Sequence, residues 1–359
     1  MTHTKILAAI SALLIMVSCA DTDQYIYNAD ADTSTSILTY NDALERWEAI
    51  LSSESFVDAT DVIPTSETDD EYDDYLENQE STRRVDIVFD ADTAYVTTTQ
   101  SDEQVHADIS GAHVTLRLDR KKLIITLSGS TTDGSLKIYS ENKFQLHLNG
   151  LAIANPRGAA INIQSKKRAF LTIAAGTQNT LADAQQYTDT IAGEDQKGCL
   201  FSEGQVIISP ADANGTPLTT STNAAMLSTA DNAAVLTVTG NARHAIATDE
   251  YLFIHPGIQL SVSNAQKDGI HTNDGLRMTG GLLRIYAQKD AVQADTLGIR
   301  MTGGRLYTCA KRPYNADPLV VTSPAVFIGI SSADAYAASS AASSSTSAAT
   351  VIYGAATSN

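Results

Sequence analysis

Charged residues recur in the last third of the chain at intervals of 22 or 24 residues and form two ladders. The first ladder consists of four dipeptides that each begin with a basic residue, and they are Arg243-His244, Lys267-Asp268, Lys289-Asp290 and Lys311-Arg312. The second ladder holds Asp249, Asn273 and Asp295, with Asp274 beside Asn273. Carboxylate, amide and turn carbonyl oxygens are hard ligands that suit calcium. The residues expected to hold calcium are Asp249, Asp268, Asn273, Asp274, Asp290 and Asp295.

An alternative interpretation makes these acids turn formers, which accept hydrogen bonds from backbone amides at tight corners. Like charges stacked this closely need a counter-ion, which favours calcium for the set more than for any single aspartate. The cations Lys267, Lys289 and Lys311 either contact the carboxylates of a uronate or neutralise the neighbouring acids. His271 lies between the two ladders and is expected to be a surface strand residue.

Tyrosine and arginine alternate in the same region, at Arg284, Tyr286, Arg305 and Tyr307. An aromatic face packs against the C–H face of a sugar ring, so outward-facing tyrosines at these positions predict a carbohydrate-stacking surface. The alternative is that these side chains only solvate one face of a sheet. The sequence contains no nucleophile elbow, Walker loop, dinucleotide fingerprint or zinc-type His/Cys cluster, and enzyme classes that depend on those motifs lose support.

Short strands must position these side chains, because apolar and polar residues alternate from residue 84 onward. An imperfect repeat starts new units near Leu136, Ile161, Leu200, Met226, Ile246, Ile270 and Val292. The spacings are 25, 39, 26, 20, 24 and 22 residues, and the longest contains an inserted loop over 176–198. Units of this length bury their inner face only by stacking. We therefore expect an all-β parallel β-helix of about eight rungs, a rung being one circuit of the chain.

The inner face of this stack is predicted from the same alternation. Pairs of apolar residues separated by one polar residue are expected to form one apolar column, and they are Leu146 and Leu148, Leu171 and Ile173, Leu236 and Val238, Leu260 and Val262, and Leu283 and Ile285.

Three segments carry a resemblance to a known family. The run from Asp133 to Asp183 and the later segments GCLFSEGQVII and KDGIHTNDGLRMTGG resemble the β-helical carbohydrate-binding domain family, over roughly residues 84–312. The resemblance implies a right-handed parallel β-helix, a fold shared with pectate lyases, and bound calcium. It also implies polysaccharide binding, with cellulose and polygalacturonate as ligands of a typical member, without a general catalytic role.

The first 19 residues predict export and lipid attachment. Lys5 precedes an apolar run over 6–17, which is typical of a secretory signal and shorter than a membrane-spanning helix. The sequence Met16-Val17-Ser18-Cys19 resembles a lipobox, in which the cysteine is acylated. We expect residues 1–18 to be a signal peptide and the mature protein to be an outer-membrane lipoprotein, anchored by Cys19 and exposed at the cell surface.

The net charge of −18 is unevenly distributed, since residues 20–82 hold 18 acidic residues against the single base Arg46. Nucleic acid is excluded as a partner, because phosphate binding requires an excess of Lys and Arg. Such a composition predicts that residues 19–83 form an acidic tether that is mostly disordered. Leu44 and Trp47 recur at helical spacing within 40–51, so Trp47 is expected to anchor a short local helix.

The remaining segments complete the domain organisation. The predicted boundaries are 84–312 for the β-helix and 313–359 for a Ser/Ala-rich C-terminal segment, in which 351–353 is a candidate last strand that caps the stack. Cys199 and Cys309 have apolar neighbours and are expected to be buried free thiols.

These observations together predict a cell-surface lipoprotein that binds an acidic polysaccharide through a calcium-containing β-helix, without catalysis. A calcium-dependent polysaccharide lyase is the first alternative, in which a Lys or Arg near the metal removes the proton α to a uronate carboxylate. A structural or adhesive surface protein is the second alternative.

Overall fold

The computed structural model describes residues 26–27, 39–51, 62–69, 71–81, 83–98, 105–218, 232–322, 324–331 and 350–355. Cys19 and the expected signal peptide lie outside these residues. Strands dominate the described part, and α2 (Tyr40–Leu51) is its one α-helix. None of the helices in this part is long and apolar enough to cross a membrane.

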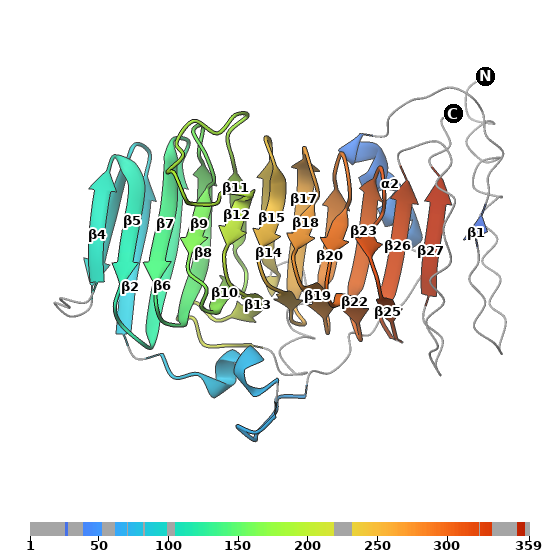
Figure 1. The fold of residues 1–359 in the computed structure, drawn as a ribbon, viewed down its shortest axis with the longest axis horizontal. Coiled ribbons are helices and arrows are strands. Elements are labelled where there is room, and N and C mark those ends of the chain that lie inside the picture. Colours follow the sequence, from blue (N-terminus) through green and yellow to red (C-terminus); the bar gives the residue numbers. More distant parts are fainter. Residues whose placement is uncertain are drawn as a thin grey trace.

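The strands stack side by side in three columns of parallel pairs (Figure 1). The first column contains β2 (Arg83–Asp90), β6 (Leu123–Thr131), β8 (Phe144–Ala154), β10 (Ala169–Ala174), β13 (Val206–Ala211), β16 (Leu252–Ile254), β19 (Gly275–Met278), β22 (Gly298–Met301) and β25 (Leu319–Val321). The second column starts at the end of β8 and continues through β11 (Gln178–Ala182), β14 (Ala234–Gly240), β17 (Ile258–Ala265), β20 (Leu282–Tyr286), β23 (Arg305–Ala310), β26 (Val326–Ser331) and β27 (Thr350–Ala355).

The third column is a separate sheet. It contains β5 (Ala112–Leu118), β7 (Gly134–Ser140), β9 (Ile161–Gln164), β12 (Gly198–Ser202), β15 (His244–Thr248), β18 (Ile270–Thr272), β21 (Val292–Ala294) and β24 (Asn315–Ala316). The chain visits the three columns in turn, so each circuit adds one strand to each of them. This arrangement of long parallel sheets fits a β-solenoid.

The predicted register of the third column is confirmed at four of its six steps. Leu136 pairs with Ile161, Ile161 with Leu200, Ile246 with Ile270, and Ile270 with Val292. Leu200, however, pairs directly with Ile246. The expected unit that starts at Met226 is therefore wrong, because no strand can be inserted between β12 and β15. Met226 lies outside the described residues, in an insertion between β13 and β14.

The interior is an apolar core that runs the length of the stack. All the predicted inner pairs are buried, but they occupy two columns rather than one. Leu146 and Leu171 are neighbours in the first column, whereas Leu236, Leu260 and Leu283 follow one another in the second. The difference arises because each circuit contains two apolar strands of similar pattern. Cys199 and Cys309 are free and buried, as predicted.

Additional strands lie at both ends of the stack. At one end, β3 (Thr93–Thr98) and β4 (Val105–Ser110) pair antiparallel with β2 and β5. At the other end, β27 pairs with β26 and also with β1 (Ile26–Tyr27). The stack continues through β24, β25 and β26, beyond residue 312, where the sequence repeat fades.

Two segments of the acidic N-terminal region pack on the outside of the columns. Helix α2 lies on the second column, where Trp47 is fully buried against Tyr307, Ile328 and neighbouring residues. This confirms Trp47 as the anchor of a local helix. Residues 71–81, called here the acidic strap, contain the 3-10 helices η1 (Tyr72–Asp74) and η2 (Leu76–Asn78). Tyr75 and Leu76 of the strap are buried against Phe170 and Phe253, so this part of the expected tether is folded.

Candidate functional site

The turns that lead into β15, β18, β21 and β24 carry the first predicted ladder. The backbone N–H of Lys267 donates to the Arg243 carbonyl at 3.2 Å, and the N–H of Lys289 donates to the Lys267 carbonyl at 3.2 Å. The N–H of Arg312 then donates to the Lys289 carbonyl at 2.9 Å. These bonds confirm the predicted alignment. The exposed side chains of Lys267, Lys289 and Lys311 occur in successive turns, and we call them the lysine ladder.

Two aspartates lie beneath the lysine ladder and are fully buried. Lys289 bridges them, with its Nζ 3.1 Å from Asp268 Oδ1 and 3.3 Å from Asp290 Oδ2. Arg312 makes a two-pronged ion pair with Asp290, in which Nη2 donates to Oδ2 at 2.5 Å. Each acid therefore already has a protein cation, and the pairing links one turn to the next.

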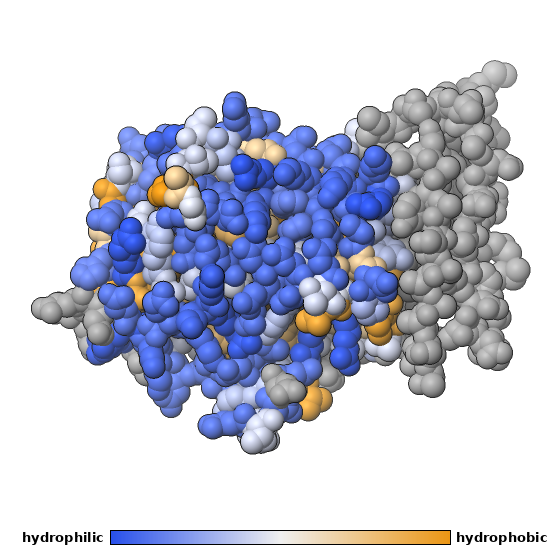
Figure 2. All heavy atoms as spheres, viewed as in Figure 1, coloured by the Kyte–Doolittle hydropathy of each residue, from blue (hydrophilic) through white to orange (hydrophobic). Residues whose placement is uncertain are grey.

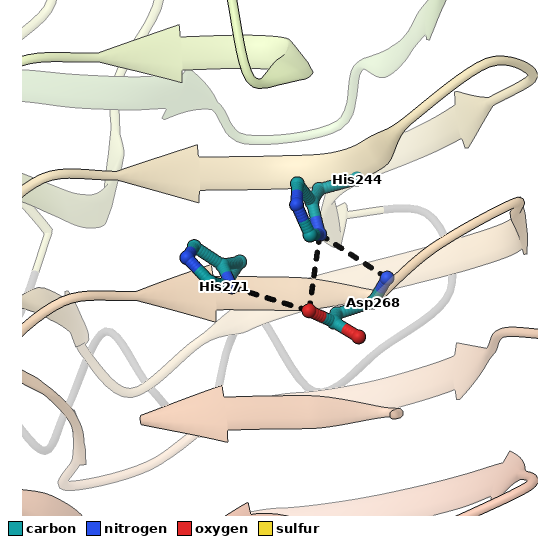
Figure 3. Close-up of side chains that lie close together, drawn as sticks. All are labelled: His244, Asp268 and His271. Carbon is teal, nitrogen blue, oxygen red and sulfur yellow. Dashed lines mark hydrogen bonds and ion pairs between the residues drawn. The ribbon is translucent and has the colours of Figure 1, made fainter. Parts of the chain in front are cut away.

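Two imidazoles complete the surroundings of Asp268 (Figure 3). His244 Nδ1 lies 3.2 Å and His271 Nδ1 lies 3.1 Å from the same carboxylate oxygen, Oδ2. The backbone N–H of Asp268 also donates to His244 Nδ1 at 3.1 Å. The two rings are stacked, with centroids 4.4 Å apart and planes at 28°. In the described part of the chain, these three residues are the one group of His, Cys and acidic side chains close enough to share an ion.

The charge states in this cluster follow from burial and pairing. Burial raises the pKa of Asp268, but its contacts with His244, His271 and Lys289 outweigh it and hold the pKa far below its usual range. Burial lowers the pKa of Lys289, and its bonds to Asp268 and Asp290 reverse this to a net rise. Burial lowers the pKa of His244, which favours the neutral imidazole. Asp268 and Lys289 are therefore both charged at neutral pH.

The first ladder does not fit calcium. Asp268 and Asp290 face ammonium, guanidinium and imidazole nitrogens, whereas calcium requires six to eight oxygen ligands. The repulsion between the stacked carboxylates is already balanced by Lys289 and Arg312. For these two aspartates the sequence argument for a counter-ion holds, but the counter-ions are side chains.

The second ladder lies at the opposite ends of the same strands. Asn273 and Asp295 follow β18 and β21, and their backbone N–H groups donate to the Thr248 and Thr272 carbonyls. Asn273 Nδ2 donates to Asp249 Oδ1 at 3.4 Å, and Gln293 Nε2 donates to Asp295 Oδ1 at 2.8 Å. Five residues of extended chain separate Asp268 from Asn273, which is about 16 Å at 3.3 Å per residue. One ion therefore cannot bridge the two ladders.

The predicted sugar-stacking surface is wrong for both tyrosines. Tyr286 and Tyr307 point away from the core, but α2 covers them, and their exposed fractions are 9% and 0%. Arg284 pairs in register with Tyr307 on the neighbouring strand, and Arg305 with Leu282, and both arginines are half-buried. No aromatic face remains available to a sugar at these positions.

A model of the carbohydrate-binding domain-containing protein family matches residues 110–211 and 211–356, which is well over half of the chain. The chain belongs to this carbohydrate-binding domain-containing family. The matched residues include both ladders.

Among curated proteins, none matches this carbohydrate-binding domain-containing chain. A solved structure with a similar arrangement is that of a polysaccharide lyase-like protein from C. thermocellum, studied as a gadolinium derivative. The two sequences are 20% identical, the TM-score is 0.44, and the match covers 66% of this chain and 98% of the other.

A second group of basic residues in this carbohydrate-binding domain-containing chain did not emerge from the sequence. Lys122, Lys143 and Arg168 each come directly before a strand of the first column, and those strand starts, Leu123, Phe144 and Ala169, are paired in register. The signal was a base immediately before each strand, at intervals of 21 and 25 residues. This signal is weak because these turns lack the Lys-Asp dipeptide of the later repeat.

Proposed function

We propose that this chain binds an acidic polysaccharide without cleaving it, as a right-handed parallel β-helix of about eight rungs. The observation that carries the proposal is the family match, which spans residues 110–356. The exposed lysine ladder supports an anionic ligand, since Lys267, Lys289 and Lys311 repeat along the stack as carboxylates repeat along a polyuronate. Weak contacts that repeat in this way add through multivalency.

The outer surface also favours a polar ligand. Figure 2 shows a mostly hydrophilic face on which the apolar patches are small and scattered. The exposed large apolar residues of the described part are likewise dispersed, and they are Val62, Val88, Tyr95, Ile109, Ile191 and Leu297. Single exposed apolar side chains of this kind do not form a protein interface.

Calcium enters the proposal through the second ladder. Asn273, Asp274 and Asp295 present carboxylate and amide oxygens near the surface, where an ion would neutralise the acids and bridge to a uronate carboxylate. Asp249 lies beside them and also pairs with Lys197. Melting temperature with and without chelator, together with elemental analysis, tests this proposal. An unchanged melting temperature and a metal-free protein would remove calcium from it. Lipid attachment at Cys19 is a further part of the proposal, and Cys19→Ala should release the protein from outer membranes.

A lyase is the second candidate function, and one contact favours it. His271 Nδ1 faces the buried Asp268 carboxylate, and a carboxylate that orients an imidazole in this way is a recurring arrangement for proton transfer. Lys289 is less suited to act as the base, because its two carboxylate partners raise its pKa. Binding therefore ranks above cleavage.

One assay separates these functions. Purified protein with calcium is incubated with polygalacturonate, and retention on the polymer and absorbance of unsaturated products are measured together. Retention without product is the expected result, and Lys267→Ala combined with Lys311→Ala should weaken it. Lys289 is left in place in this variant because it neutralises Asp268 and Asp290. Sustained product that disappears in His271→Ala would replace the binding proposal by lyase activity. If the protein shows neither retention nor product, a structural role remains.

A further inference from the structure

A pocket of about 370 Å³ lies where the acidic strap meets the turns that precede β6, β8 and β10. The strap contributes one wall through Leu76, Gln79, Glu80 and Ser81. The turns contribute four lysines, which are Lys121, Lys122, Lys143 and Lys167. The volume falls in the range of small-molecule sites, and the lysines of the lining outnumber its two acids, Glu80 and Glu141.

The lysines are brought together by strand register. Leu123, Phe144 and Ala169 are aligned neighbours, so the residues just before them, Lys122, Lys143 and Arg168, are stacked about 4.8 Å apart. We call these three residues the basic row. Lys121 and Lys167 lie one position earlier in their turns, at the mouth of the pocket, and both are exposed.

Acidic side chains of the strap form ion pairs with all three residues of the basic row. Asp73 Oδ2 lies 2.6 Å from Lys143 Nζ, and Asp74 Oδ1 lies 3.0 Å from Arg168 Nη2. Glu80 pairs with Lys122, and this contact lowers the pKa of Glu80. Beyond the row, Glu71 Oε2 lies 2.6 Å from Arg277 Nη2. An extended polyanion therefore fits this face of the stack, and the strap is the chain's own example of one.

The strap leaves two cations at the mouth of the pocket without an acid. Within the described ranges, Lys121 and Lys167 take part in no ion pair, whereas Lys122 and Lys143 pair with the strap. Leu76, Phe144 and Phe170 also line the pocket, but their exposed fractions are only 5%, 2% and 1%. A ligand for this space therefore needs a compact body and at least one negative charge near Lys121 and Lys167.

We propose that the pocket between the acidic strap and the turns before β6, β8 and β10 is a subsite for an anionic sugar of the uronate type, held by Lys121 and Lys167. The inference rests on the proposed function and adds a second place where the polymer is bound, on a different column from the lysine ladder. A uronate ring matches the requirement because it is compact and its carboxylate projects from the edge of the ring.

The test compares two adjacent lysines of one turn. Lys167→Gln removes a cation that lines the pocket, and Lys166→Gln removes an equally exposed cation that does not. Binding of a galacturonate trimer is measured by calorimetry at low salt, because a trimer reports single subsites rather than avidity. Lys167→Gln should weaken binding about fivefold, and Lys121→Gln with Lys167→Gln about tenfold or more, whereas Lys166→Gln should change it less than twofold. The fully methyl-esterified trimer, which lacks the charge, should not bind the pocket.

The outcomes separate this inference from the proposed function. Equal affinities for Lys167→Gln, Lys166→Gln and the unaltered protein, with a loss in the Lys267→Ala and Lys311→Ala variant, would overturn the pocket and leave the lysine ladder. Undiminished binding of the esterified trimer would also overturn it, since charge would then play no part. Absence of binding of any acidic polymer or trimer to the unaltered protein would overturn both.

Discussion

Replacing Asp268 by asparagine tests the most interconnected contact of the stack. The carboxylate is fully buried and has His244, His271 and Lys289 within 3.2 Å, and it also accepts from the backbone N–H of Asp290 at 3.3 Å. Removal of one partner of a buried charged pair costs about 3–5 kcal/mol. Lys289 is 49% exposed and keeps Asp290 at 3.3 Å, so water offsets part of the loss. We expect Asp268→Asn to lower the free energy of unfolding by about 3 kcal/mol at pH 7.

The pH dependence of this loss has a defined sign. The pKa of Asp268 is lowered in the folded protein, so its stabilising contribution is complete above the unfolded value of about 3.9 and is lost as pH falls below it. The difference between the unaltered protein and Asp268→Asn should therefore shrink as the pH falls from about 4 towards 3.

The measurement is urea denaturation followed by far-UV circular dichroism at a series of pH values. Asp295→Asn, measured with chelator present, is the matched control, because Asp295 is an exposed acid at the opposite end of these short strands with one hydrogen bond from Gln293. That control should change stability by less than about 0.5 kcal/mol. A loss below 1 kcal/mol for Asp268→Asn, or a loss that persists unchanged at pH 3, would refute the reasoning.

Two further predictions concern the segments outside the ladders. Trp47→Ala should lower stability by about 3 kcal/mol, because it removes the fully buried anchor of α2, and thermal denaturation with the exposed Glu48→Ala as control checks this. Burial lowers the pKa of His147 to about 4, so its neutral form stabilises the fold above about pH 6.5 and this contribution is lost as pH falls towards 4. His147→Gln should therefore lose less stability than the unaltered protein between pH 7 and pH 5 in urea denaturation, and equal losses would contradict it.

The sequence predicted the register of the stack well because apolar alternation and strand spacing are local signals. Leu136, Ile161 and Leu200 could be aligned from their neighbours alone, and each is paired as expected. The expected unit at Met226 failed for a physical reason. An insertion with apolar residues has the same local pattern as a strand, and only its inability to pair between Leu200 and Ile246 excludes it.

The sequence predicted which turns of the candidate site are aligned, but not which of their side chains are buried. The spacing of Lys267 and Lys289 places them in successive turns, as the backbone hydrogen bonds confirm. It cannot tell that Asp268 and Asp290 turn inward beneath Lys289, because burial depends on how each turn folds. The covering of Tyr286 and Tyr307 was equally hidden, since Trp47, which packs over them, comes from a helix far away in the sequence.

The packing of the N-terminal segments on late strands also determines the order in which the molecule can be completed. Each strand of the columns pairs with one from the preceding circuit, so the stack can grow progressively as the chain emerges. Glu71, in contrast, is bonded to Arg277, which lies 206 residues further along, and Trp47 packs on β23 and β26. Helix α2 can therefore dock only when β23 and β26 exist, whereas the strap can complete its contacts once β19 has formed. A protein truncated before β23 would lack the surface on which α2 packs, and Trp47 would then lose its buried site.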